Sequence, residues 1–194
     1  MNKAQIASNA SMLVGAGQIQ SLDDQPNQAE LLKSIYDTTK VSLLMEEYWV
    51  FAKRQAVLQE LAKTPNQPYQ VVYSTPADYL SYARNSEGIQ FEIFGTELHS
   101  YKHNDNEPFT INYIANLSEA LLPQFFINVL QYRLARDICM GLTDDNSKFQ
   151  LLSRQKEVEL DKALSINLRD RDTIVNQNAG GNLSARQNLY VTNR

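Results

Sequence analysis

The spacing of apolar residues changes twice along this chain, from the period of a helix to that of a strand and back. Up to about Glu46, and again from about Leu121, apolar side chains recur every three or four positions, as on one face of a helix. Between these parts, Phe91 and Ile93 alternate with polar neighbours, which is typical of a half-buried strand. The pattern predicts an α+β fold with a mainly α-helical bundle body, a small antiparallel β-sheet insertion and an extended C-terminal arm.

Two helices are predicted before the strands. The first is stopped by Gly15 and Gly17, because glycine readily adopts the backbone conformation that ends a helix. The second has Pro26 in its first turn and runs to about Glu46. The segment 49–61 either continues the second helix or forms a separate short one.

Two further helices are predicted after the strands. The third starts near Pro123 and is closed by Gly141. The fourth runs from Lys148 to about Leu168 and carries many charges, so its apolar stripe is thin.

The predicted sheet is centred on a hairpin. If Gly95-Thr96 forms a two-residue turn, Ile93 lies opposite Leu98 and Glu92 lies opposite His99. One face of the hairpin would then be apolar and the other polar. With 69–73 and 109–113, the hairpin makes an antiparallel sheet of three or four strands.

Four parts of the chain follow from these patterns. They are an N-terminal helical part of the body at 1–64, the β insertion at 65–116, C-terminal helices at 117–170 and the arm at 171–194. From residue 173 onward the apolar period is lost and no acidic residue occurs. Such a segment cannot bury a core of its own, so we expect it to be disordered until it meets a partner. We expect Arg186, Tyr190 and Arg194 to bind that partner.

Composition excludes several classes of protein. A net charge of −4 argues against a general nucleic-acid binder, which needs clustered Lys and Arg. A single cysteine, Cys139, excludes an internal disulfide and a cysteine-based zinc site. No apolar run is long enough to span a membrane, and the polar residues within the first apolar stretch argue against a secretory signal.

The candidate chemical groups do not form a catalytic motif. On a strand, His99 and His103 would lie roughly 13 Å apart, too far for one metal ion. Glu92 and Glu97 could hold the spacing of a glycosidase pair, but a chain with 22 acidic residues produces such pairs by chance. We therefore expect no catalytic residue, no cofactor and no metal.

Several short motifs occur in a fixed order along residues 5–170. We interpret Trp49, Phe51, Tyr73, Pro76 and Asp78 as core or motif residues, because a Trp-x-Phe pair at a helix-to-sheet junction is typically a core anchor. The full order is Val14-Gly15, Ser21-Leu22-Asp23-Asp24, Tyr36-Asp37, Trp49-x-Phe51-Ala52-Lys53-Arg54, Tyr73, Pro76, Asp78, Leu80, and a proline-started helix with Leu134-Ala135.

In this order and spacing the chain resembles the tail tubular protein A family of short-tailed bacteriophages. It departs from the family at Tyr79, where many relatives carry cysteine. The resemblance implies a structural virion protein and not an enzyme: a head-to-tail adaptor, dodecameric in the family, that joins the portal to the tail nozzle.

The resemblance also implies partners and a location. A homo-oligomeric ring would contact the portal protein, the tail nozzle protein and, by family analogy, tail fibres. Genomic DNA would pass through its channel without sequence recognition during ejection. The protein would be made in the bacterial host cytoplasm and reside in the tail or neck of the virion.

Two alternatives remain at this point. A phage-tail hydrolase of envelope polysaccharide would use Glu92 and Glu97. A neck or head-completion protein of a long-tailed phage would share the helical body, but those proteins are commonly shorter and often lack so large a β insertion.

Overall fold

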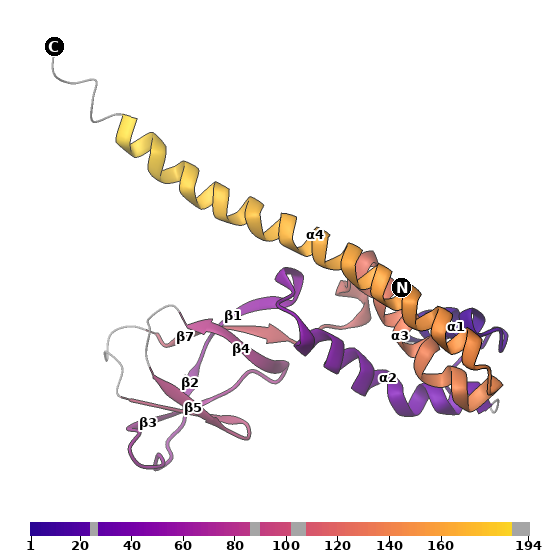
Figure 1. The fold of residues 1–194 in the computed structure, drawn as a ribbon. Helices are drawn as coiled ribbons and strands as arrows, with labels where there is room; N and C mark the ends of the chain where they lie inside the picture. The colour runs from indigo at the N-terminus through magenta and orange to yellow at the C-terminus, as the bar shows by residue number, and fades with distance from the viewer. Residues whose placement is uncertain (24–26, 86–89, 102–107, 188–194) are drawn as a thin grey trace. The chain divides into compact units, whose positions relative to one another are not determined.

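The computed structural model shows an α+β protein whose helices and strands gather in two compact units (Figure 1). It describes the backbone of residues 1–23, 27–85, 90–101 and 108–187, and the side chains of these ranges except 83–85 and 172–187. One unit comprises Met1–Thr39 and Leu122–Arg194 and is helical. The other, Lys40–Leu121, holds the strands and is inserted between the two parts of the first.

The helical unit contains α1 (Lys3–Val14), α3 (Gln124–Thr143), α4 (Asn146–Gln187) and most of α2 (Asn27–Glu46). Its core is the apolar stripe predicted for α3, packed against α1 and α4. The residues of the stripe that are buried are Phe126, Ile127, Val129, Leu130, Leu134 and Ile138. From α1, Ile6, Ala7, Ala10 and Val14 are buried against it.

Both ends of α1 are fixed by local contacts. The side chain of Asn2 accepts from the backbone of Gln5 and the side chain of Gln5 accepts from Asn2, a reciprocal cap. Gly15 ends the helix in the left-handed region at φ 83°, as predicted. The Lys148 ammonium donates to the carbonyl oxygen of Val14 at 2.7 Å and so joins the end of α1 to the first turn of α4.

Two predicted helix ends are wrong. Gly141 does not close α3, because its backbone stays helical and Asp144 takes the left-handed C-cap position at φ 49°. The fourth helix does not stop near Leu168 but continues to Gln187. The arm expected to lose helical structure from residue 173 is therefore helical over 173–187.

The β unit contains two antiparallel sheets. One has the order β1-β7-β4 and the other β2-β3-β6-β5. The strands are β1 (Lys53–Val57), β2 (Gln59–Glu60), β3 (Val71–Ser74), β4 (Tyr79–Asn85), β5 (Phe91–Phe94), β6 (Glu97–Ser100) and β7 (Thr110–Ala115). The single sheet of three or four strands predicted from the sequence is thus corrected to two.

Aromatic rings join the two sheets. Phe109, just before β7, stacks on Tyr73 of β3 with ring centroids 4.8 Å apart. The ring of Phe91 on β5 meets both Phe109 and Tyr82 of β4 edge to face. Tyr73 and Phe109 are buried and belong to the core of the unit, whereas Phe91 is half-buried and Tyr82 is exposed.

The predicted hairpin register is confirmed. Ile93 pairs with Leu98 and Glu92 with His99, around the turn at Gly95. His99 is a cross-strand residue, paired with Glu92 and Val72, and not a surface residue, because its side chain is only 4% exposed. The segment before β3 covers it: the backbone N–H of Asn66 donates to His99 Nδ1 at 3.0 Å.

Neither helical alternative for 49–61 is correct. A single 3₁₀ turn, η1 (Val50–Ala52), leads directly into β1 at Lys53. Strands therefore begin inside the segment 1–64 that was expected to be helical. The side chains of β1 are nearly all exposed, so the strand carries little of the alternation by which strands are recognised.

A buried lysine joins the beginning and the end of the β unit. Lys40 Nζ lies 3.1 Å from both the carbonyl oxygen of Leu117 and Oε1 of Glu119, and its side chain is 8% exposed. Charge-assisted hydrogen bonds of this kind are stronger than neutral ones, and a buried ammonium requires them.

Candidate functional site

The motif residues of the β unit lie in or against its core. Trp49 is fully buried, and its indole N–H donates to the carbonyl oxygen of Leu43 at 2.8 Å. The ring of the half-buried Phe51 lies 5.7 Å from that of Trp49. This pair anchors the end of α2 to the start of the sheets.

Asp78 organises the polar edge of the first sheet. Its carboxylate accepts from the hydroxyl of Tyr113 at 2.9 Å and pairs with Arg54 at 3.2 Å, while its carbonyl oxygen accepts from Asn116 N at 2.7 Å. Burial, and then the hydrogen bond to Asp78, raise the pKa of Tyr113 to about 12. The half-buried Pro76 accepts from Tyr79 N in the turn before β4. These contacts give Asp78 a structural role.

The hairpin carboxylates do not have the environment of a catalytic pair. Lys63 pairs with Glu97 and, as the main cause, lowers the pKa of that carboxyl. Glu92 accepts from the hydroxyl of Tyr69, whose pKa is raised chiefly by desolvation. A general acid needs a raised pKa, so Glu97 is unsuited to protonate a leaving group.

His99 lies on the same face of the hairpin as these carboxylates. Its Nε2 is 3.5 Å from Oε2 of Glu97, longer than an ordinary hydrogen bond. Rings of Tyr69 and Phe94 meet the imidazole edge to face. Over the described ranges, no three His, Cys, Asp or Glu side chains gather closely enough to hold a metal ion. His103 lies outside them.

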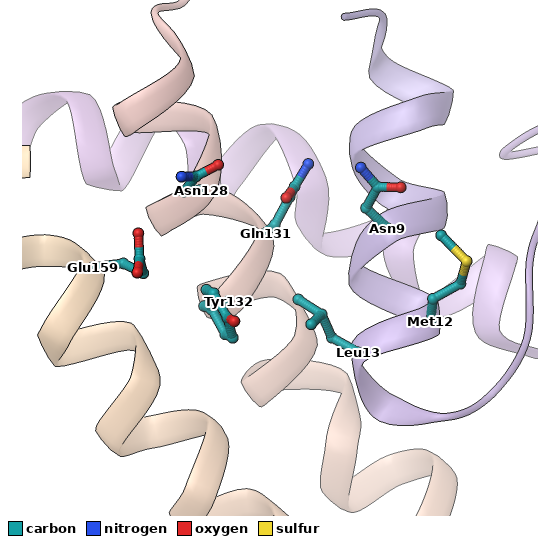
Figure 2. Close-up of a pocket in the computed structure, with 7 residues that line it drawn as sticks. All are labelled: Asn9, Met12, Leu13, Asn128, Gln131, Tyr132 and Glu159. Carbon is teal, nitrogen blue, oxygen red and sulfur yellow. The ribbon is translucent and has the colours of Figure 1, made fainter.

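An open groove lies on the outer side of the helical unit, between α1, α3 and α4 (Figure 2). Its volume is about 450 Å³, within the range of binding pockets. Three amides, a phenol and one carboxylate make its polar lining. The lining residues are Asn9, Met12, Leu13, Asn128, Gln131, Tyr132 and Glu159.

Helix geometry explains why these residues share the groove. Asn9, Met12 and Leu13 on α1 have the spacing i, i+3, i+4, and so do Asn128, Gln131 and Tyr132 on α3. Both sets lie on faces turned away from the core positions of their helices. Leu13 is half-buried and lines the groove.

Gln131 is the most unusual residue of the groove. Its Nε2 is buried and has no hydrogen-bond acceptor among the described residues. Leaving such a donor unpaired costs about 1–3 kcal/mol. The side chain extends from α3 toward α1, at the wall of the groove (Figure 2). A rotation of the side chain toward a bound carbonyl oxygen would recover this free energy.

α4 presents apolar side chains to solvent on the side away from the core. Leu151, Val158 and Leu168 are 57%, 45% and 47% exposed. The last buried residue described on this helix is Asn167, and Leu168 to Arg171 are all exposed. The apolar stripe is as thin as predicted.

The arm residues predicted to bind a partner have no described side chains. Arg186 lies in the helical backbone of α4, whereas Tyr190 and Arg194 lie outside the described residues. In the part of the chain that the structure describes, no helix is both long enough and apolar enough to cross a membrane.

Sequence reasoning missed the groove. Its signal was the set of amide residues at helical spacing on α1 and α3, but single amides on outward faces are common. Comparison with models of known protein families finds no match to this chain, and comparison with curated proteins finds no matching protein.

Proposed function

We propose that this protein is a structural component of a bacteriophage tail, a head-to-tail adaptor that forms a ring between the portal and the tail nozzle. The observation that carries the proposal is the length of α4. α3 has 20 residues and α4 has 42, so about half of α4 has no helix of equal length to pack on within its unit. A helix of this kind is suited to contacts with other subunits.

The exposed face of α4 supports the same proposal. Leu151 and Val158 lie one heptad apart on this face, and charged residues of both signs surround them. A neighbouring subunit would cover the apolar positions and pair with the charges at the rim. The ordered motifs from Val14-Gly15 to Leu134-Ala135, which resemble those of tail tubular protein A, support an adaptor ring as that assembly.

In the proposed assembly the protein is not an enzyme and requires no cofactor. The ring, a dodecamer by analogy, would sit in the virion between portal and nozzle, and genomic DNA would pass through it.

The net negative charge of the chain comes from the β unit. Lys40–Leu121 carries 6 basic and 10 acidic residues, whereas the helical unit carries 12 of each. A surface of like charge lets DNA pass without binding it.

Light scattering on the purified chain, alone and mixed with the cognate portal ring, tests the proposal. We expect co-elution as one large complex whose mass corresponds to a ring of this chain bound to the portal. A chain that stays separate from the portal over a range of salt concentrations would contradict the adaptor role.

A further inference from the structure

The groove has a lining that suits a polar peptide carrying a positive charge. Asn9, Asn128 and Gln131 each offer both a donor and an acceptor, as the amides of a peptide do. Glu159 is the one acidic residue of the lining, and its pairing with Lys162 at 2.7 Å leaves room for a second donor. Gln131 lines the groove and its buried Nε2 lacks an acceptor, so this side chain would gain a hydrogen bond if it turned toward an occupant that brings a carbonyl oxygen.

The C-terminal segment of the chain has the matching composition. Residues 172–194 contain five asparagines, two glutamines and the arginines Arg186 and Arg194. The only acidic residue of this segment is Asp172, at its start. Its amides can pair with those of the groove, and an arginine can form a charge-assisted pair with Glu159.

A chain cannot place this segment in its own groove while α4 is intact. From Glu159 to Gln187, α4 is one continuous helix (Figure 1), and these 28 steps span about 42 Å. The seven residues after Gln187 reach at most about 25 Å when fully extended. The occupant must therefore come from another molecule.

We propose that the groove between α1, α3 and α4 receives the C-terminal segment 172–194 of a second copy of this chain. The proposal rests on the proposed ring and names the contact that would join its subunits. The 20 residues from Asn167 to Gln187 span about 30 Å, roughly the diameter of a small domain, so the segment can reach the next subunit.

Photo-crosslinking of the full chain tests this contact. p-Benzoylphenylalanine replaces Met12, which lines the groove, or, as a matched control, Met140, an exposed methionine of α3 outside it. Chains labelled with ¹⁵N are mixed with unlabelled chains that carry the crosslinker, in the largest assembly that light scattering detects. We expect position 12, and not position 140, to crosslink to labelled peptides from 172–194.

Variants of the groove add a second readout. Glu159→Gln removes the charge that the arginine would meet, and we expect the crosslink yield from position 12 to fall about tenfold. Glu157→Gln, two residues away on the same helix and outside the groove, should leave the yield unchanged. Crosslinks only within one chain, only to other segments, or at equal yield in both variants would overturn the proposal, as would a chain that stays monomeric.

The same samples separate this proposal from the adaptor function. If the chain co-elutes with the portal but position 12 gives no crosslink to 172–194, the groove assignment is wrong and the adaptor function stands. If neither co-elution nor the crosslink is observed, both are wrong.

Discussion

The hydrogen bond between Tyr113 and Asp78 connects the central strand of the first sheet to the turn before β4. The hydroxyl of Tyr113 donates to the carboxylate of Asp78, which also pairs with Arg54 on the opposite side of β7. Arg54 on β1 and Tyr113 on β7 therefore both contact the carboxylate of Asp78, which lies just before β4. Because the folded state keeps Tyr113 protonated up to about pH 12, its stability depends on pH in the alkaline range.

Tyr113→Phe should weaken this dependence. In the wild type the unfolded chain loses the phenol proton near pH 10 and the folded chain near pH 12, so stability falls between these values. We expect the variant to be about 1–2 kcal/mol less stable in urea at pH 7, with a flatter profile between pH 10 and 12. Tyr101→Phe, which alters a partly exposed ring, serves as the control; equal slopes in wild type and Tyr113→Phe would contradict the expectation.

For the helices and strands, the sequence predicted which residues of one element share a buried face. It did not predict which distant segments pack over that element. The register of β5 and β6 followed from the turn at Gly95, because a two-residue loop leaves one pairing. β1 was missed because its exposed residues show no alternation. The burial of His99 was missed because the segment that buries it, around Asn66, is distant in sequence. The groove was missed because it exists only where two outward faces meet.

The end of α4 was also missed, for a different reason. Gly180 and Gly181 interrupt the apolar period, and glycine in a helix costs up to about 1 kcal/mol relative to alanine. Sequence reasoning took this as loss of structure, yet the backbone is helical through Gln187. The two glycines therefore lower the intrinsic helix propensity of this part of α4.

Replacing both glycines by alanine should increase the helical signal. We expect Gly180→Ala combined with Gly181→Ala to raise the far-ultraviolet circular dichroism of the isolated chain, because about 1–2 kcal/mol of helix propensity is added. Gly141→Ala is the matched control: this glycine lies within α3, and an added Cβ would make an ordinary contact with Leu31. The control should raise Tm without adding helix, and an unchanged signal in the double variant would show that the glycines do not limit α4.

For the whole molecule, the residues that form the helical core are distinct from the C-terminal segment that we expect to contact other molecules. The core of the helical unit lies between α1, α3 and the first part of α4, and Asn167 is the last buried residue among those of α4 whose side chains are described. The last four residues of α4 whose side chains are described, Leu168 to Arg171, are all exposed. Loss of the C-terminal segment is therefore expected to affect contacts with other molecules and not the fold.

Deletion of residues 173–194 tests this separation. We expect Tm and the near-ultraviolet circular dichroism to stay close to those of the full chain, while binding to the portal ring weakens about tenfold or more, because many weak contacts around a ring act together. Binding would be measured by titration of the portal ring with the labelled chain. Docking at full affinity would show that the arm has no part in it.

The contact of Lys40 with Leu117 and Glu119 has a consequence for how the chain folds during synthesis. The ribosome releases α1 and α2 well before α3 and α4, so the first two helices must wait for their packing partners. If residues 40–121 were a flexible loop, closing that loop would cost entropy that grows with its length. Once the β unit has folded, the contacts of Lys40 with Leu117 and Glu119 hold its two ends together. The entropy of loop closure is then lost before α3 emerges. We therefore expect the folded β unit to lower the entropy that is lost when the two parts of the helical unit come together.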